Sequence, residues 1–118
     1  KIDIFNFGKM KRDFTYIDDI VSGIEGAVSF ASSDKSMHKI YNLGNNNSED
    51  LLYFIDLIEH NLGIKSKRNF LPLQAGDVPE TFADITSSKK DLGFKPITKI
   101  KEGIPKFIQW YKSYYEIE

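Results

Sequence analysis

Arg12 is the residue whose type and setting point most clearly to chemistry. It lies in the stretch RDFTYIDD, residues 12–19, on an expected strand that leads directly into an expected helix. From there the planar guanidinium can face a pair of phosphate oxygens, a geometry that lysine matches less well. An ion pair with Asp13 or another nearby acid is the structural alternative, and the residues alone favour neither interpretation.

The loop of residues 74–77 is the second candidate site. Gln74 and Asp77 supply hydrogen-bonding groups on either side of Gly76, where the missing side chain lets a ligand approach the backbone. The carboxylate of Asp77 is equally suited to fastening a turn. Binding, rather than catalysis, is the chemistry that these residues offer.

The sequence lacks the motifs that other common chemistries require. The chain has no cysteine, its serines do not stand in a glycine elbow, and His38 and His60, expected at the surface, do not have the spacing of a zinc signature. Its eight glycines never form the glycine-rich turn of a dinucleotide fold. We therefore expect no metal site and no cofactor bound by this region alone. The basic cluster Lys65, Lys67 and Arg68 is interpreted as solvated surface.

The composition predicts one globular domain. Apolar residues make up 41% and aromatic residues 14% of 118 residues, enough to form a core. The formal charge of -1 makes neither nucleic acid nor a membrane surface an expected partner. No apolar run approaches the roughly 20 residues of a membrane span, and the absence of cysteine fits a reducing cytoplasm. The chain opens inside an alternating pattern, so we expect a fragment of a longer protein.

Short strands between helices must position the candidate residues. Residues 1–17 are predicted to form a hairpin of two strands around Gly8. Apolar residues at helical spacing predict a helix that begins at Asp18 or Asp19, whose carboxylates can accept hydrogen bonds from its first free amides. Gly23 and Gly26 inside this helix indicate close approach of another backbone.

The second half of the sequence is predicted to contain one strand and three helices. Residues 39–44 are predicted as a short buried strand, and further helices are expected over residues 48–62, 86–93 and 98–115. Asn47 or Ser48 is the expected cap of the first of these, and Gly63 its left-handed end. Pro105 predicts that the last helix either kinks or begins nearer to Glu102. The fold class is a mixed α/β lobe of short strands and about four helices, not a complete doubly wound sheet.

Four segments together resemble the carboxyl-terminal lobe of nucleotide-sugar epimerases of the extended short-chain dehydrogenase/reductase superfamily. These are GKMKRDFTYIDDIV at 8–21, IYNLGNNN at 40–47, LPLQAGDVPETFAD at 71–84 and DLGFKP at 91–96. The sequence is similar in particular to bacterial UDP-glucuronate 4-epimerases, including the glutamine of LPLQAGDV. The resemblance implies that residues 1–118 are the C-terminal substrate-binding domain of a Rossmann-type enzyme whose N-terminal NAD-binding domain is absent from the chain.

The resemblance also implies roles for the candidate residues. Arg12 matches the family arginine that contacts the substrate diphosphate, and Asp77 matches an acid placed near the ribose hydroxyls. Gln74 matches a position that is arginine in UDP-galactose 4-epimerases, so a second cationic contact is not implied. No tyrosine of this chain has a lysine four residues later, so the family's catalytic pair is not carried over.

The implied reaction takes place in the full-length parent. A hydride moves from C4 of the sugar to NAD, the keto sugar turns over, and the hydride returns to the opposite face. The implied partners are a UDP-sugar and the chain's own missing Rossmann domain, in a homodimeric parent that serves polysaccharide biosynthesis, while this fragment alone is inactive. The alternatives are the lobe of a related dehydratase or decarboxylase, or a stand-alone interaction module without catalysis.

Overall fold

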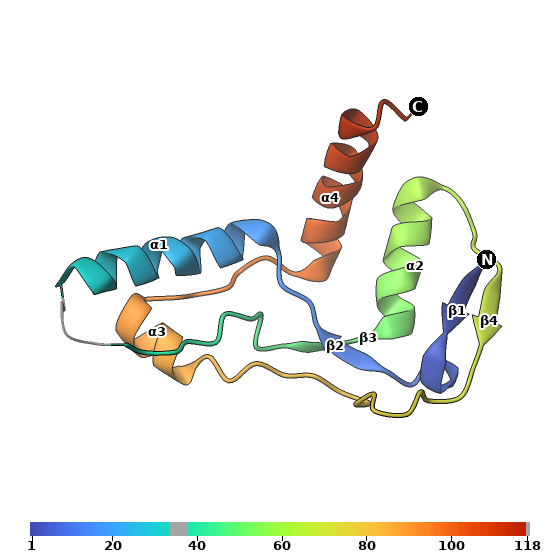
Figure 1. The fold of residues 1–118 in the computed structure, drawn as a ribbon. Helices are drawn as coiled ribbons and strands as arrows, with labels where there is room; N and C mark the ends of the chain where they lie inside the picture. Colours follow the sequence, from blue (N-terminus) through green and yellow to red (C-terminus); the bar gives the residue numbers. More distant parts are fainter. Residues whose placement is uncertain (34–37, 118) are drawn as a thin grey trace. The chain divides into compact units, whose positions relative to one another are not determined.

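The computed structural model describes residues 1–33 and 38–117, which form short strands and helices (Figure 1). In chain order the elements are β1 (Ile2–Ile4), the 3-10 helix η1 (Phe5–Gly8), β2 (Lys11–Asp13), α1 (Ile17–Ser33), β3 (Ser48–Asp50), α2 (Leu51–Leu62), β4 (Arg68–Phe70), α3 (Thr86–Leu92) and α4 (Ile100–Tyr114). The mixed α/β class with four helices, predicted from the sequence, is confirmed for the described residues.

The chain divides into two compact units. Unit 1 comprises Lys1–Arg12, Glu49–Thr81 and Lys99–Glu118, and unit 2 comprises Asp13–Ser48 and Phe82–Thr98. The strands β2 and β3 pair with each other, and the chain passes from one unit to the other within each of them. Each unit is therefore assembled from segments that are far apart in the sequence.

The strand β1 of unit 1 pairs in parallel with β4, with Ile2 opposite Arg68 and Ile4 opposite Phe70. The predicted hairpin between residues 1 and 17 is wrong, because β1 and β2 pair with different strands. Between them η1 turns the chain sharply through left-handed φ angles at Asn6 and Phe7. A parallel partner more than sixty positions away leaves no turn signal next to β1.

The helices α2 and α4 pack together in unit 1. The core of this unit contains buried Ile4 and Met10 and one side of α4, formed by Ile100, Ile104 and Ile108. As predicted, α2 ends at Gly63, which has a φ of 70° and donates its amide to the last turn. Pro105 lies inside α4, which nevertheless begins at Ile100. On the same helix Phe107 and Tyr111 are 52% and 40% exposed.

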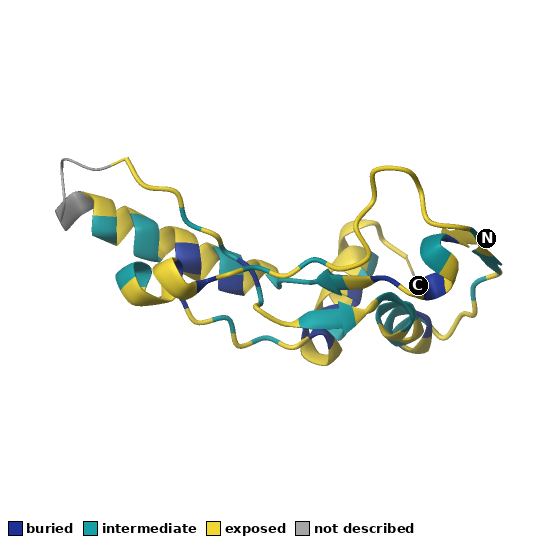
Figure 2. Cartoon of the chain, turned by 90° about the horizontal axis from the view of Figure 1, so that it is seen from below, coloured by how far each residue is buried: buried dark blue, intermediate teal, exposed yellow. Residues whose placement is uncertain are grey.

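Unit 2 is built on α1, which packs against α3. A β-carbon at Gly26 would lie 2.6 Å from the carbonyl oxygen of Leu92, so the close approach of another backbone predicted there is confirmed. At Gly23 the prediction is wrong, because a β-carbon would lie 2.7 Å from the side chain of Leu43 rather than from a backbone. The predicted strand at 39–44 is wrong, since the segment joins no ladder among the described residues. Figure 2 shows how exposed and buried residues alternate along the helices.

Asp19 has a different role from the one predicted. Its carboxylate is 5% exposed and accepts a hydrogen bond from the backbone N–H of Thr98 at 2.9 Å, so it holds a distant segment of unit 2 rather than capping α1. The helix itself begins two residues earlier, at Ile17. Among the described residues no helix combines the length and the apolar character that crossing a membrane requires.

Candidate functional site: an anchored arginine beside a turn

Arg12 is a half-buried residue of β2 whose guanidinium is held by backbone oxygens. Its Nη1 donates to the carbonyl oxygen of Lys11 at 2.8 Å and to that of Pro79 at 3.2 Å. The backbone of β2 is bound to the same segment, because the amide of Lys11 donates to Pro79 at 2.8 Å and the amide of Thr81 donates to Lys11 at 3.2 Å. The arginine is thus fixed at the carboxyl end of the loop that contains Gln74 and Asp77.

The anchoring leaves one edge of the guanidinium available. A guanidinium carries five N–H donors, and both hydrogen bonds described above come from Nη1. Within the described part of the chain neither Nη2 nor Nε of Arg12 donates to another residue. This edge has the parallel donor geometry that a phosphate or carboxylate accepts in a bidentate pair.

The loop before Pro79 contains a tight turn. The amide of Asp77 donates to the carbonyl oxygen of Gln74 at 3.2 Å, and Gly76 has a φ of +89°. Nothing lies within 4 Å of the position that a β-carbon of Gly76 would occupy. Gln74 and Asp77 are both exposed, and it is the backbone of Asp77 that closes the turn. Their side chains are therefore open to a ligand in solution.

Asp13, the residue next to Arg12, has a role that the sequence did not reveal. Its carboxylate accepts hydrogen bonds from the amides of Asn45 at 2.9 Å, Asn46 at 3.0 Å and Ala83 at 3.0 Å. Asn46 has a φ of 54°, a left-handed conformation that asparagine tolerates better than most residues. Asp13 therefore binds two loops of unit 2, and the pairing with Arg12 considered from the sequence is not what holds Arg12 in place.

The cap predicted for the second helix is also wrong. The N-cap residue of α2 is Asp50, and no side-chain hydrogen bond caps this helix. The amide of Leu51 donates instead to the carbonyl oxygen of Met10 at 2.9 Å. One of the first free amides of α2, that of Leu51, is therefore satisfied by the backbone before β2, and the amides of Asn45 and Asn46 bind Asp13.

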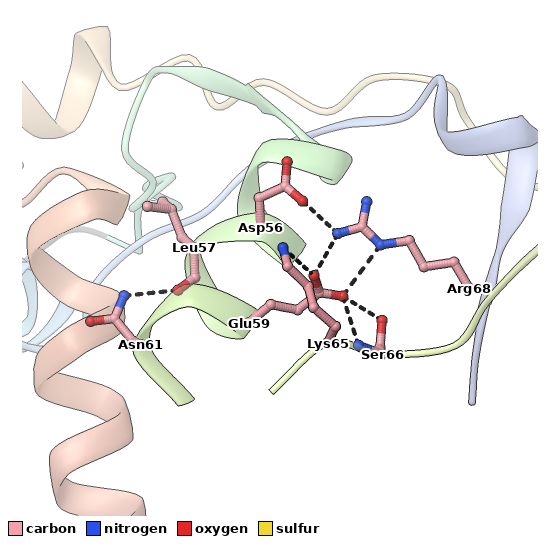
Figure 3. A network of polar contacts seen from close by, with 7 residues as sticks. All are labelled: Asp56, Leu57, Glu59, Asn61, Lys65, Ser66 and Arg68. Atoms are coloured by element: carbon pink, nitrogen blue, oxygen red, sulfur yellow. Dashed lines mark hydrogen bonds and ion pairs between the residues drawn. The ribbon is translucent and has the colours of Figure 1, made fainter. Parts of the chain in front are cut away.

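Two residues of the basic cluster of unit 1, Lys65 and Arg68, pair with acids of α2 (Figure 3). Glu59 is 5% exposed and accepts hydrogen bonds from Nη2 of Arg68 at 2.8 Å, from the amide of Ser66 at 3.1 Å and from the Ser66 hydroxyl, and it forms an ion pair with Lys65 at 3.0 Å. Arg68 also pairs with Asp56. The solvated surface expected for this cluster is thus correct for Lys65 but wrong for Arg68, whose side chain is 24% exposed.

These contacts shift the proton affinities of the pair. The hydrogen bonds from Arg68, and next those from Ser66, hold the pKa of Glu59 far below its ordinary range. Glu59 in turn raises the pKa of Arg68. Both groups stay charged at neutral pH, so the cluster fastens β4 to α2 and has no acid–base role.

A second ionic cluster lies in unit 2. Lys39 forms an ion pair with Asp91, and the hydroxyl of Tyr41 donates to the same carboxylate at 3.0 Å. The Lys39 ammonium holds the pKa of Asp91 below its ordinary value, and desolvation raises the pKa of Tyr41. A phenol with a raised pKa is a poor general base near neutral pH, which makes this cluster structural. In residues 1–33 and 38–117 no group of three acids or histidines is placed to hold a metal ion.

The fold is similar to that of solved nucleotide-sugar epimerases. The chain superimposes on UDP-glucuronic acid 4-epimerase from Bacillus cereus, solved in complex with UDP-glucuronic acid and NAD, with a TM-score of 0.82 and 28% identity. The match covers 96% of this chain and 35% of that chain. The resemblance seen in the sequence is confirmed: the chain matches the carboxyl-terminal part of an extended short-chain dehydrogenase/reductase, in the branch that contains nucleotide-sugar epimerases.

Curated proteins also match the chain in sequence. Protein CapI of Staphylococcus aureus is 41% identical over 129 residues, which cover 98% of this chain and 39% of CapI. UDP-glucuronate 4-epimerase 1 of Arabidopsis thaliana is 42% identical over 118 residues, 90% of this chain and 27% of that protein. The chain therefore spans less than half the length of these two relatives. No protein-family model matches the chain.

Proposed function

We propose that this chain is the nucleotide-sugar-binding lobe of an NAD-dependent UDP-glucuronate 4-epimerase, with residues 1–118 forming its C-terminal substrate-binding domain. The observation that carries the proposal is the guanidinium of Arg12, anchored through Nη1 with its other edge unoccupied by described residues. The relatives support the choice of substrate, because one bears the name UDP-glucuronate 4-epimerase and another was solved with UDP-glucuronic acid.

Each candidate residue has a role in this proposal. Arg12 donates two parallel hydrogen bonds to the diphosphate, and its fixed position means that little side-chain entropy is lost on binding. Gln74 contributes a neutral hydrogen bond next to it. Asp77 accepts hydrogen bonds from the ribose hydroxyls, and the open backbone at Gly76 admits the nucleotide. The lobe contributes no catalytic residue of its own.

The remainder of the parent would supply the chemistry. NAD, bound outside this chain, accepts and returns the hydride at C4 of the sugar. The lobe holds the nucleotide while the sugar turns, so that binding energy remote from C4 keeps the intermediate in the site. The proposal includes a homodimeric cytoplasmic parent that serves polysaccharide biosynthesis. It also includes the inactivity of these residues without the NAD-binding part.

Steady-state kinetics of the intact gene product with UDP-glucuronate and NAD test the proposal. In Arg12→Ala we expect the KM to rise about ten- to a hundredfold, the effect of losing a charged hydrogen bond to the substrate. Arg12→Lys should recover part of this loss, because it keeps the charge and loses the fork. Lys11→Ala removes the neighbouring exposed cation and serves as the matched control.

The outcomes of these kinetic experiments distinguish the proposed function from its alternatives. An unchanged KM in Arg12→Ala removes the arginine from the substrate site. Conversion of UDP-glucuronate to a decarboxylated or dehydrated product, in place of the C4 epimer, assigns the lobe to a different reaction of the same family. Failure of the intact protein to bind UDP in any form leaves an interaction module and overturns the proposal.

A further inference from the structure

The carbonyl oxygen of Pro79 accepts two hydrogen bonds in unit 1. One comes from the backbone N–H of Lys11 at 2.8 Å, and the other comes from Nη1 of Arg12 at 3.2 Å. A carbonyl oxygen has two lone pairs, so both bonds can form at once and use its full capacity as an acceptor. One peptide group therefore holds both the backbone of β2 and the side chain of Arg12.

The backbone at Pro79 is restrained before any ligand binds. Lys11 forms a parallel β-bridge with Glu80, and this pairing uses the carbonyl of Pro79 and the N–H of Thr81. The N–H that proline lacks is not needed there, so the ring costs no hydrogen bond. The ring also fixes the φ of Pro79 at about −65° and restricts Val78 to extended conformations. The carbonyl is therefore held in place by both the ring and the bridge.

The same peptide group is one of two fixed ends of the candidate loop. At the other end Leu71 donates its amide to the carbonyl oxygen of Ile4 at 2.8 Å and accepts a hydrogen bond from the amide of Phe7 at 2.9 Å. Residues 72–78 between these ends are exposed. The guanidinium and the candidate loop therefore share one fixed point.

The carbonyl oxygen of Lys11, the other acceptor of Nη1, holds the arginine in a different way. It belongs to the residue directly before Arg12 and accepts at 2.8 Å, so it moves together with the arginine. Pro79 lies 67 positions away along the chain. Of these two bonds, the one to Pro79 ties the guanidinium to a distant segment and thereby sets the direction of its free edge.

We propose that Pro79 is a positioning residue for nucleotide-sugar binding, acting through Arg12 without touching the substrate. This inference rests on the proposed function, in which the Nη2 and Nε edge of Arg12 binds the diphosphate. Because Pro79 holds Nη1, this edge is presented in one orientation and little freedom is lost on binding. With a looser backbone at this position, the guanidinium spends a smaller fraction of its time in the competent orientation, and the apparent affinity falls by that fraction.

General stiffening of the loop is the competing explanation for the proline. A looser loop would weaken the contacts of Gln74 and Asp77, and it would do so whether or not position 12 is an arginine. Positioning through Arg12 requires the arginine to be present. The two explanations therefore differ in a double-mutant cycle, which measures whether the effects at positions 12 and 79 depend on each other.

The test measures UDP binding to the intact gene product by isothermal titration calorimetry, together with the KM and kcat for UDP-glucuronate. We expect Pro79→Gly to raise the Kd and the KM about fivefold and Pro79→Ala about twofold, because glycine frees the backbone more than alanine does. The kcat should not change, since the loss concerns binding of the diphosphate. In the Arg12→Ala background the same substitutions should change the Kd by less than about twofold.

Pro72→Gly is the matched control, because it loosens the opposite end of the same loop. Its effect on the Kd should be the same with and without the Arg12 side chain. Urea unfolding checks that every variant is folded under the assay conditions. If Pro79→Gly does not fold, the milder Pro79→Ala carries the cycle.

Three results would overturn the inference. Equal effects of Pro79→Gly with and without the Arg12 side chain would mean that the proline acts on the loop alone, and the proposed function would stand. A lowered kcat at unchanged KM would place the effect of Pro79 in the chemical step rather than in binding. An unchanged Kd and KM in Arg12→Ala itself would remove the arginine from the substrate site, so that the proposed role of Arg12 and this inference would fall together.

Discussion

The carboxylate of Asp13 accepts a hydrogen bond from the amide of Ala83 across 70 positions of sequence. The same carboxylate binds the amides of Asn45 and Asn46. Arg12, one position earlier, binds the carbonyl oxygen of Pro79 in unit 1. Successive residues of a strand point to opposite sides, so two neighbouring charges serve two separate sets of contacts. The sequence RDF therefore places a candidate binding group, Arg12, next to a structural anchor, Asp13.

Asp13→Ala should destabilise the protein by about 1–3 kcal/mol, because backbone amides lose their acceptor in a partly buried setting. Urea unfolding monitored by circular dichroism measures the change in the free energy of unfolding. Asp13→Asn keeps one acceptor oxygen and should cost less. Glu25→Ala, an exposed acid on α1, is the control and should leave the midpoint unchanged. Equal midpoints for Asp13→Ala and the control would contradict the anchoring role.

Gly44→Ala should also destabilise the protein, since a β-carbon there would lie 2.4 Å from the β-carbon of Ala83. Overpacking of this kind costs about 1–3 kcal/mol. Removing the opposing methyl group makes room, so we expect the double variant Gly44→Ala with Ala83→Gly to be more stable than Gly44→Ala alone. A double-mutant cycle from thermal unfolding measures the coupling. Additive effects would show that the two positions do not meet.

The Glu59 cluster should make stability depend on acidic pH. The pKa of Glu59 is lowered in the folded protein, chiefly by Arg68, so the unfolded state binds the proton more readily. Its stabilisation is complete above the ordinary glutamate range and is lost as the pH falls below that range towards the folded pKa. We expect Glu59→Gln to be less stable than the wild type at neutral pH and to lose less stability on acidification. Parallel pH profiles of the two proteins would contradict this, and Glu80→Gln, an exposed acid, is the control.

Gln74→Arg should tighten the binding of UDP to the intact gene product. The substitution adds a cation to the loop that ends beside Arg12, and we expect the Kd to fall about two- to tenfold at low salt. The gain should shrink as the ionic strength rises, because salt screens exposed charges. Isothermal titration calorimetry at two salt concentrations measures both effects. Gln109→Arg on α4 carries the same change of charge, and an equal gain there would show that position 74 does not face the diphosphate.

The local features of the fold could be predicted from the sequence. The helices α1 and α2 follow from apolar spacing, and α2 and α3 end at Gly63 and Gly93, whose left-handed φ angles glycine adopts readily. These signals lie within a few residues of the structure that they determine. The strands could not be predicted in the same way, because β1 finds its partner in β4, far along the chain.

The candidate residues could be named from the sequence, but the contacts that hold them in place could not be predicted. Arg12, Gln74 and Asp77 were recognisable from residue type and resemblance, and their contact with substrate stays a prediction. The carbonyl oxygen of Pro79 carries no sequence signal, since every residue has one. Glu59 gave no sign of its burial either. A charged residue in the middle of an amphipathic helix is expected to face solvent. The burial of Glu59 follows only from its contacts with Arg68 and Ser66, which the sequence does not show.

The manner in which Arg12 is anchored has a consequence for its electrostatic field. Peptide carbonyls orient the guanidinium without carrying a net opposite charge, and in the described chain no ion pair joins Arg12 to an acid. Arg68 is the opposite case, since Asp56 and Glu59 cancel its charge. Of these two half-buried arginines, Arg12 is the one without an acidic partner among the described residues, so we expect small polyanions such as pyrophosphate to be drawn to it ahead of the cluster on α2.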